Sequence, residues 1–167
     1  MNKLPFIIPE RDLNLRVAVV VMILDRLSYT KRKKFILNLD KIAIYEFLVT
    51  QPFVLHELVE KDSKLPRFHL QENEKGSVRT KYINKKSLID YSSIKELLQI
   101  LLVHQFVKIE RDKNEFFYVI TEKGTEFISA VESDYLYRVR ELCDVISKLT
   151  SIPSSNLKRL INPILGV

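Results

Sequence analysis

The 167-residue sequence is poor in the residues that build disulfides, zinc clusters and sharp turns. It has one cysteine, Cys143, so it can form neither an intrachain disulfide nor a cysteine-based zinc site. Because Cys143 lies among apolar residues on an expected helix, we predict a small buried side chain rather than a reactive thiol. There are 3 glycines, 6 prolines and no tryptophan, which favours long helices over many short strands and turns.

The patterns of known catalytic sites are also missing. The glycines are too far apart to form a phosphate-binding loop. His56 and Glu60 have the spacing of two metal ligands on a helix, but no third ligand is evident. Glu72 and Glu74 stand in a polar stretch, which we interpret as a solvated loop rather than an acid–base pair. The sequence therefore predicts no enzyme, no metal or cofactor, and no small-molecule substrate.

Long hydrophobic runs are absent as well. The longest, residues 17–24, is far shorter than the roughly 20 residues that cross a bilayer. Charged residues stand just before this run, which argues against a signal peptide. We expect a cytoplasmic protein without membrane contact. Its formal net charge of +6 permits binding to nucleic acid or another acidic surface, without identifying either.

We predict three regions along the chain. They are an N-terminal arm at 1–11, a main domain at 12–130 and a C-terminal helical extension at 131–167. Two prolines bracket apolar residues in the arm, so we expect the arm to lie on the body or on a partner. Within the main domain, residues 62–90 break the helical rhythm and are rich in basic residues. This segment is either an inserted hairpin or a mobile loop.

The first expected helix ends near residue 27 and is apolar nearly all round. Asp12 or Asn14 can cap it, because a short polar side chain accepts hydrogen bonds from the free N–H groups of the first turn. A helix without a polar face is buried on more than one side. We therefore expect either the central helix of the domain or a helix that lines an interface.

The front half of a helix-turn-helix layout is expected next. Asn38 or Asp40 can cap a second helix that ends near Thr50. Pro52 suits the first turn of a third helix over residues 52–61.

The back half of the main domain has the order of a winged helix. A helix over 94–104 precedes two strands, 106–110 and 115–120, that are joined by a polar turn. Thr121 can cap the next helix, and Gly124 lets the start of that helix approach the neighbouring strand closely. We therefore predict a mainly α fold with a small antiparallel β-hairpin, arranged as a winged helix-turn-helix.

A long helix is expected to follow the hairpin, over residues 122–149, with a short one over 154–161. The apolar residues of the long helix form one packed stripe. Four of its charged residues are expected to face water: Arg138, Arg140, Glu141 and Lys148.

The helix over 94–104 would be a poor reader of DNA bases. Its polar residues include one lysine and one glutamate, whereas a reading helix presents Arg, Lys, Asn or Gln to the major groove. Two basic clusters elsewhere are candidates for sequence-independent contact with phosphates, although both also fit solvated loops. Their residues are Lys31, Arg32, Lys33 and Lys34, and then Lys75, Arg79, Lys81, Lys85 and Lys86.

Surplus apolar surface is expected in the arm, on the first helix and on the long terminal helix. Such surface is typical of contacts with other proteins. The candidate interface residues are Phe6, Ile7, Ile8, Val17, Val20, Val21, Tyr135 and Tyr137.

Most of the chain resembles the small middle components of bacterial three-component ABC systems, which include the Lamassu type of antiphage defence. The resemblance lies in Asn38–Leu48 (NLDKIAIYEFL), the following Pro52, and Tyr118-x-Ile120-Thr121-x-x-Gly124. It implies a non-enzymatic subunit of an SMC-like or Rad50-like ATPase complex, which links the ATPase to a separate effector. No catalytic residue is carried over.

Two other functions remain open from the sequence, and one of them is a hydrolase or nuclease with an unrecognised site. The chain can be a dimeric winged-helix transcriptional regulator in which the long terminal helix forms the dimer stalk. That function predicts a palindromic operator bound with nanomolar affinity.

Overall fold

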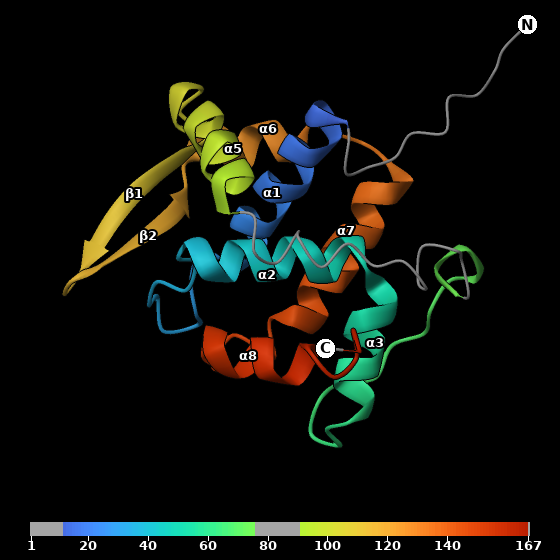
Figure 1. Cartoon of the computed structure of the whole chain (residues 1–167). Helices are drawn as coiled ribbons and strands as arrows, with labels where there is room; N and C mark the ends of the chain where they lie inside the picture. The colour runs from blue at the N-terminus through green and yellow to red at the C-terminus, as the bar shows by residue number, and fades with distance from the viewer. Residues whose placement is uncertain (1–11, 76–90, 167) are drawn as a thin grey trace, which may run out of the picture.

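The structure is a computed structural model that describes residues 12–75 and 91–166 (Figure 1). Within these residues the fold is mainly helical with one small antiparallel β-hairpin, as the sequence predicts. The helices are α1 (Leu13–Leu27), α2 (Leu39–Thr50), α3 (Pro52–Glu60), α5 (Tyr91–Val103), α6 (Glu122–Ser129), α7 (Asp134–Ile146) and α8 (Ser154–Ile161). A short 3₁₀ helix η1 (Glu72–Glu74) precedes α5, and the strands are β1 (Val107–Asp112) and β2 (Glu115–Ile120).

Polar side chains cap the helices at the predicted places. Asp12 accepts hydrogen bonds from the backbone N–H groups of the first turn of α1. The Asn38 side chain accepts from the backbone N of Lys41 at 2.9 Å and begins α2. Pro52 stands in the first turn of α3, where its missing N–H group leaves no partner unsatisfied. The local chemistry of the sequence therefore sets these helix starts.

Helices α1 and α2 form the centre of the core. Every residue from Ala18 to Leu24 in α1 is buried, as is every residue from Ile42 to Val49 in α2. The first helix packs against α2, α6 and α7, and α2 contacts α1, α3, α5, α7 and α8. The expected apolar helix is therefore the central helix of the domain, and α2 shares that position.

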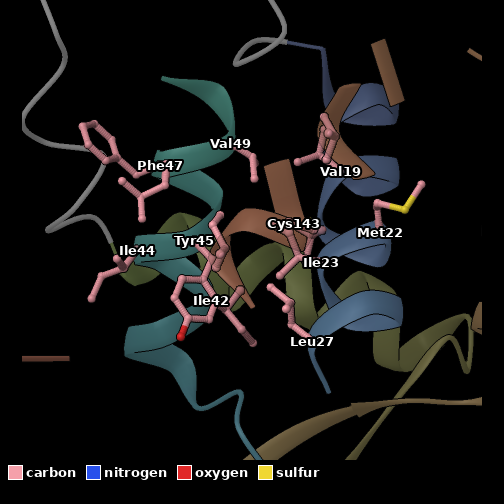
Figure 2. Packing of buried hydrophobic residues seen from close by; sticks show 14 of the residues in the cluster. Val19, Met22, Ile23, Leu27, Ile42, Ile44, Tyr45, Phe47, Val49 and Cys143 are labelled. Atoms are coloured by element: carbon pink, nitrogen blue, oxygen red, sulfur yellow. The ribbon is translucent and has the colours of Figure 1, made fainter. Parts of the chain in front are cut away.

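Figure 2 shows how side chains fill the space between these helices. Ile23 and Leu27 of α1 point toward Tyr45 of α2, and Cys143 of α7 lies among them. Cys143 is fully buried, which confirms the prediction from its apolar neighbours. Ile44 points away from α1 and is nevertheless buried, because α2 is covered on more than one side.

The hairpin projects from the helical body, and the loop between α1 and α2 lies on the same side (Figure 1). Its register places Val107 opposite Ile120 and Asp112 opposite Glu115. Near its base, the backbone N of Tyr118 donates to the Leu37 carbonyl at 2.8 Å. The loop between α1 and α2 therefore runs beside β2.

The expected single helix over 122–149 is wrong. Helix α6 ends at Ser129, and α7 begins at Asp134 after a break. The Ser133 side chain accepts from the Leu136 backbone N at 3.4 Å and so starts a new helix. After the break α7 packs against α1, and its buried residues belong to the same core as those of α1 and α2. Residues on both sides of the predicted 130/131 boundary thus share one core.

No single helix in the described ranges is long and apolar enough to span a bilayer. Helices α2 and α3 reach that length and composition only as a pair, across a bend of 100°.

Candidate interaction surfaces

The start of α6 fixes the hairpin to the body. The Thr121 hydroxyl accepts from the Gly124 backbone N at 3.1 Å and donates to the Gln105 carbonyl at 2.5 Å. A Cβ atom at Gly124 would lie 2.3 Å from the carbonyl oxygen of Phe106, so a larger residue does not fit there. The Phe106 ring stacks on Phe127 with centroids 4.6 Å apart. The Thr-x-x-Gly pattern therefore has the mechanical role that the sequence predicts.

Helix α5 offers few base-reading side chains. Lys95, Glu96 and Gln99 lie on its exposed face, while its apolar residues pack inward. Val103, at the end of the helix, is one of the most exposed apolar residues of the described chain. A single lysine beside a glutamate gives this face little attraction for phosphates.

The hairpin exposes two large apolar side chains that the sequence analysis missed. Ile109 is 47% exposed and Phe116 is 58% exposed. Because Ile109 pairs with Tyr118 and Arg111 pairs with Phe116, the two apolar residues lie diagonally on one face of the hairpin. The Arg111 guanidinium lies 5.9 Å from the centroid of the Phe116 ring. The alternation of side chains along the strands predicts that both lie on one face. It does not predict how far along that face the core extends, so their exposure was not expected.

Lys31, Arg32, Lys33 and Lys34 stand on a tight turn, residues 30–34, which we call the basic turn. Its backbone closes on itself: Thr30 N donates to the Lys34 carbonyl at 2.9 Å, and Lys33 N donates to the Thr30 carbonyl at 2.9 Å. The Thr30 hydroxyl also accepts from Lys34 N at 3.1 Å. All four cationic residues are exposed. The structure thus holds the first predicted basic cluster together.

Aromatic rings connect the basic turn to the hairpin. Tyr29 and Phe35 form an isolated β-bridge at the base of the turn, with ring centroids 5.8 Å apart. The Phe35 ring in turn contacts Phe117 of β2 at 5.7 Å. Farther along, the Asn38 amide donates to a Glu115 carboxylate oxygen at 2.6 Å. The basic turn and the hairpin are therefore braced against each other.

Of the second basic cluster, only Lys75 falls in the described ranges. It is exposed, and its Nζ lies 2.8 Å from Oε1 of Glu72. The other members lie outside the described residues: Arg79, Lys81, Lys85 and Lys86.

The candidate protein-interface residues have different environments. Val20 and Val21 are fully buried in the core, so they offer no surface to a partner. Val17 and Tyr135 are partly buried, and Tyr137 on α7 is exposed. The arm residues lie outside the described residues: Phe6, Ile7 and Ile8.

Arg138 was expected to face water, and this expectation is wrong. Its Nε donates to Oε1 of Glu74 at 2.9 Å, and its Nη2 donates to Oε2 at 2.8 Å. Nη2 also donates to the His69 carbonyl at 2.8 Å, and the guanidinium lies 5.6 Å from the Phe68 ring centroid. The hydrogen bonds to Glu74 raise the pKa of Arg138. Glu74, interpreted from sequence as solvated, is likewise mostly covered.

Two titratable side chains lie buried in the core of the described residues, Cys143 and Tyr45. Burial raises the pKa of the Cys143 thiol and that of the Tyr45 hydroxyl. Nε2 of His56 lies 3.9 Å from a Glu60 carboxylate oxygen. Within the described ranges no group of three or more His, Cys, Asp or Glu side chains is arranged to hold a metal ion.

Comparisons with known proteins place the chain in a family. Neither the curated proteins nor the solved structures gave a match. One family model, described as ABC-three component (ABC-3C) system Middle Component 4, matches residues 27–159. The match extends from the end of α1 into α8, and it confirms the expectation of a middle component. The chain therefore belongs to the Middle Component 4 family of ABC-three component systems.

Proposed function

We propose that the chain is a non-catalytic winged-helix adaptor that links an SMC-like or Rad50-like ABC ATPase to an effector in bacterial defence of the Lamassu type against phages or plasmids. Membership in a multi-component ABC family supports the need for protein partners. The order of α1, the segment beside β2, α2, α3, α5 and the hairpin supports the winged-helix assignment. Sequence-independent contact with DNA is a second activity in this proposal.

The observation that carries the adaptor role is the exposed apolar face of the hairpin. Ile109 and Phe116 lie beyond the core, on an element that projects from the body. Aromatic residues and arginine are enriched in protein interfaces, and Arg111 covers one side of the Phe116 ring. A partner that buries this face would remove both apolar side chains from water.

Other candidate surfaces remain part of the proposal. Tyr137 on α7 is exposed and stands apart in sequence from the hairpin. The arm, with Phe6, Ile7 and Ile8, is proposed to contact a partner or the body. Val20 and Val21 leave the proposed interface because they belong to the core.

The alternative function, a dimeric regulator, loses its dimerisation element. It needs a long terminal helix as a stalk, whereas the chain turns between α6 and α7 and α7 packs against α1. It also needs a base-reading helix, and α5 exposes few suitable side chains.

Co-expression with the ATPase and the effector of the same system tests the adaptor role. A double substitution, Ile109→Ser with Phe116→Ser, removes the apolar face, and Leu160→Ser is a control at an exposed leucine on α8. We expect the double variant to bind the partner complex at least about 10-fold more weakly, because central aromatic contacts dominate such interfaces. The control is expected to bind as the wild type does.

Two results would overturn the proposal. One is failure of the wild-type chain to co-purify with either subunit. The other is equal binding by the wild type and the double variant, with circular dichroism spectra showing that both are folded.

A further inference from the structure

We propose that the basic turn, residues 30–34, is a preformed binding site for the phosphate backbone of double-stranded DNA, whatever its sequence. This inference names the site for the DNA contact included in the proposed function. It does not depend on the ATPase or the effector, so it can be tested with the purified chain alone.

The four cations of the basic turn are not neutralised by the rest of the described chain. Arg16, Arg26 and Arg138 each form an ion pair with a carboxylate. In contrast, no ion pair within the described ranges includes Lys31, Arg32, Lys33 or Lys34. Four like charges on consecutive residues repel one another, and a polyanion that approaches them relieves this repulsion.

The turn is also held in one shape before any ligand arrives. Three hydrogen bonds close it, and the backbone of Lys33, just after the tip, adopts a positive φ of 56°. Phe35 and Phe117 brace it from the hairpin side. A preformed site loses less conformational entropy on binding than a flexible tail with the same charge.

The chemistry of the turn favours nucleic acid over an acidic protein segment. Three of its four cations are lysines, a residue type depleted at protein interfaces, and residues 30–34 contain no apolar side chain. Phe35 lies between the rings of Tyr29 and Phe117, so Tyr29, 42% exposed, is the one ring beside the described turn that is open to a base, whereas single-strand binding uses several successive stacking rings. The closely spaced positive charges of the compact turn are complementary to the high negative charge density of a duplex, which carries one charge about every 1.7 Å along its axis.

The tip of the hairpin is not expected to take part. Arg111 and Lys113 are offset there by Asp112 and Glu115. In addition, the Arg111 side chain donates to the Lys113 carbonyl at 3.2 Å and lies over the Phe116 ring. The tip has no excess of positive charge.

The test measures binding of the full-length chain to two unrelated 30-base-pair duplexes, to one strand of a duplex alone and to polyglutamate, between 50 and 200 mM salt (about the range over which phosphate contacts are resolved). The variant carries Lys31→Gln, Arg32→Gln, Lys33→Gln and Lys34→Gln. A matched control carries Lys61→Gln, Lys64→Gln, Lys148→Gln and Arg159→Gln, four exposed cations with the same total charge.

We expect the wild type to bind both duplexes equally. The turn variant should lose at least about 10-fold in affinity at the low-salt end, and its slope of log affinity against log salt should become shallower by about 3. The control should change affinity by less than about 3-fold and keep most of its salt slope. Melting curves verify that both variants are folded.

Several outcomes would contradict the proposal that the basic turn binds duplex DNA. Equal losses in the turn variant and the control would mean that net charge matters and the turn does not. Tighter binding to the single strand, a preference for one duplex, or binding to polyglutamate but not to DNA would contradict the assigned ligand. If the wild type binds no DNA, the site fails while the adaptor role, tested by co-purification, is unaffected.

Discussion

Arg138 on α7 and Glu74 in η1 form a two-point ion pair between segments that are 64 residues apart in sequence. The side chains are 13% and 9% exposed, and the pair has further contacts to His69 and Phe68. It fastens the stretch after α3 to helix α7. The pair therefore fixes the position of the short helix η1 against α7.

Replacing Arg138 should loosen that stretch. Arg138→Gln leaves the Glu74 carboxylate covered without its partner, and we expect the free energy of unfolding to fall by about 2 kcal/mol. Limited trypsin digestion should also cut sooner at Lys64 and Arg67 in the variant. Glu141→Gln is the control, because that partner of Arg138 is largely exposed, and it should cost less than about 0.5 kcal/mol. Similar urea midpoints for both variants would contradict the structural role.

A methyl group at Gly124 should be destabilising. Glycine to alanine within a helix usually stabilises by about 0.5–1 kcal/mol, but here the new Cβ would meet the Phe106 carbonyl. We expect Gly124→Ala to lower the free energy of unfolding by about 2–3 kcal/mol in urea titrations. Ser129→Ala, at the exposed end of α6, should stay within about 0.5 kcal/mol of wild type. A more stable Gly124→Ala protein would show that the hairpin base is not packed as described.

Removing the Tyr45 hydroxyl should stabilise the protein. This oxygen is buried without a hydrogen-bond partner in the described structure. Folding therefore removes its hydrogen bonds to water and forms no hydrogen bond in their place. We expect Tyr45→Phe to raise the free energy of unfolding by about 1 kcal/mol. The exposed Tyr137 provides the control, since Tyr137→Phe should change stability by less than about 0.5 kcal/mol. A destabilised Tyr45→Phe variant would indicate a polar partner for the hydroxyl.

Cys143 should make stability fall at alkaline pH. Burial raises the pKa of its thiol, so the folded protein keeps the proton while the unfolded chain loses it above about pH 8.5. The unfolded state then binds fewer protons, and stability falls by up to about 1.4 kcal/mol per pH unit. Urea titrations from pH 7 to 9.5 should show this slope, and Cys143→Ala should reduce it. Iodoacetamide should label wild-type Cys143 only in denaturant; rapid labelling of the native protein would contradict its burial.

Much of the fold could be predicted because its signals are local. Asn38 and Thr121 cap the helices predicted for them, and Gly124 stands where a strand and a helix meet closely. The bounds predicted for the helix over 154–161 agree with α8. Such features depend on a few neighbouring residues, so a single sequence is sufficient to find them.

The failures concern contacts between distant segments. The sequence analysis placed Arg138 and Glu74 in water because neither has a local partner, and only the folded chain brings them together. It placed Val20 and Val21 at an interface because periodicity cannot tell a central helix from one covered by another subunit. The break before α7 did have a local signal, the Ser133-Asp134 pair, but the continuing apolar stripe outweighed it.

Strand β2 carries two neighbouring aromatic residues with different surroundings. Phe116 faces solvent with Arg111, whereas Phe117 packs on Phe35 behind the basic turn. Successive side chains on a strand point to opposite faces, so one short piece of backbone holds both. If a ligand on one side shifted this backbone, it would also alter the fit on the other side. By thermodynamic reciprocity, protein bound over Phe116 and DNA bound at the turn would then change each other's affinity by the same factor.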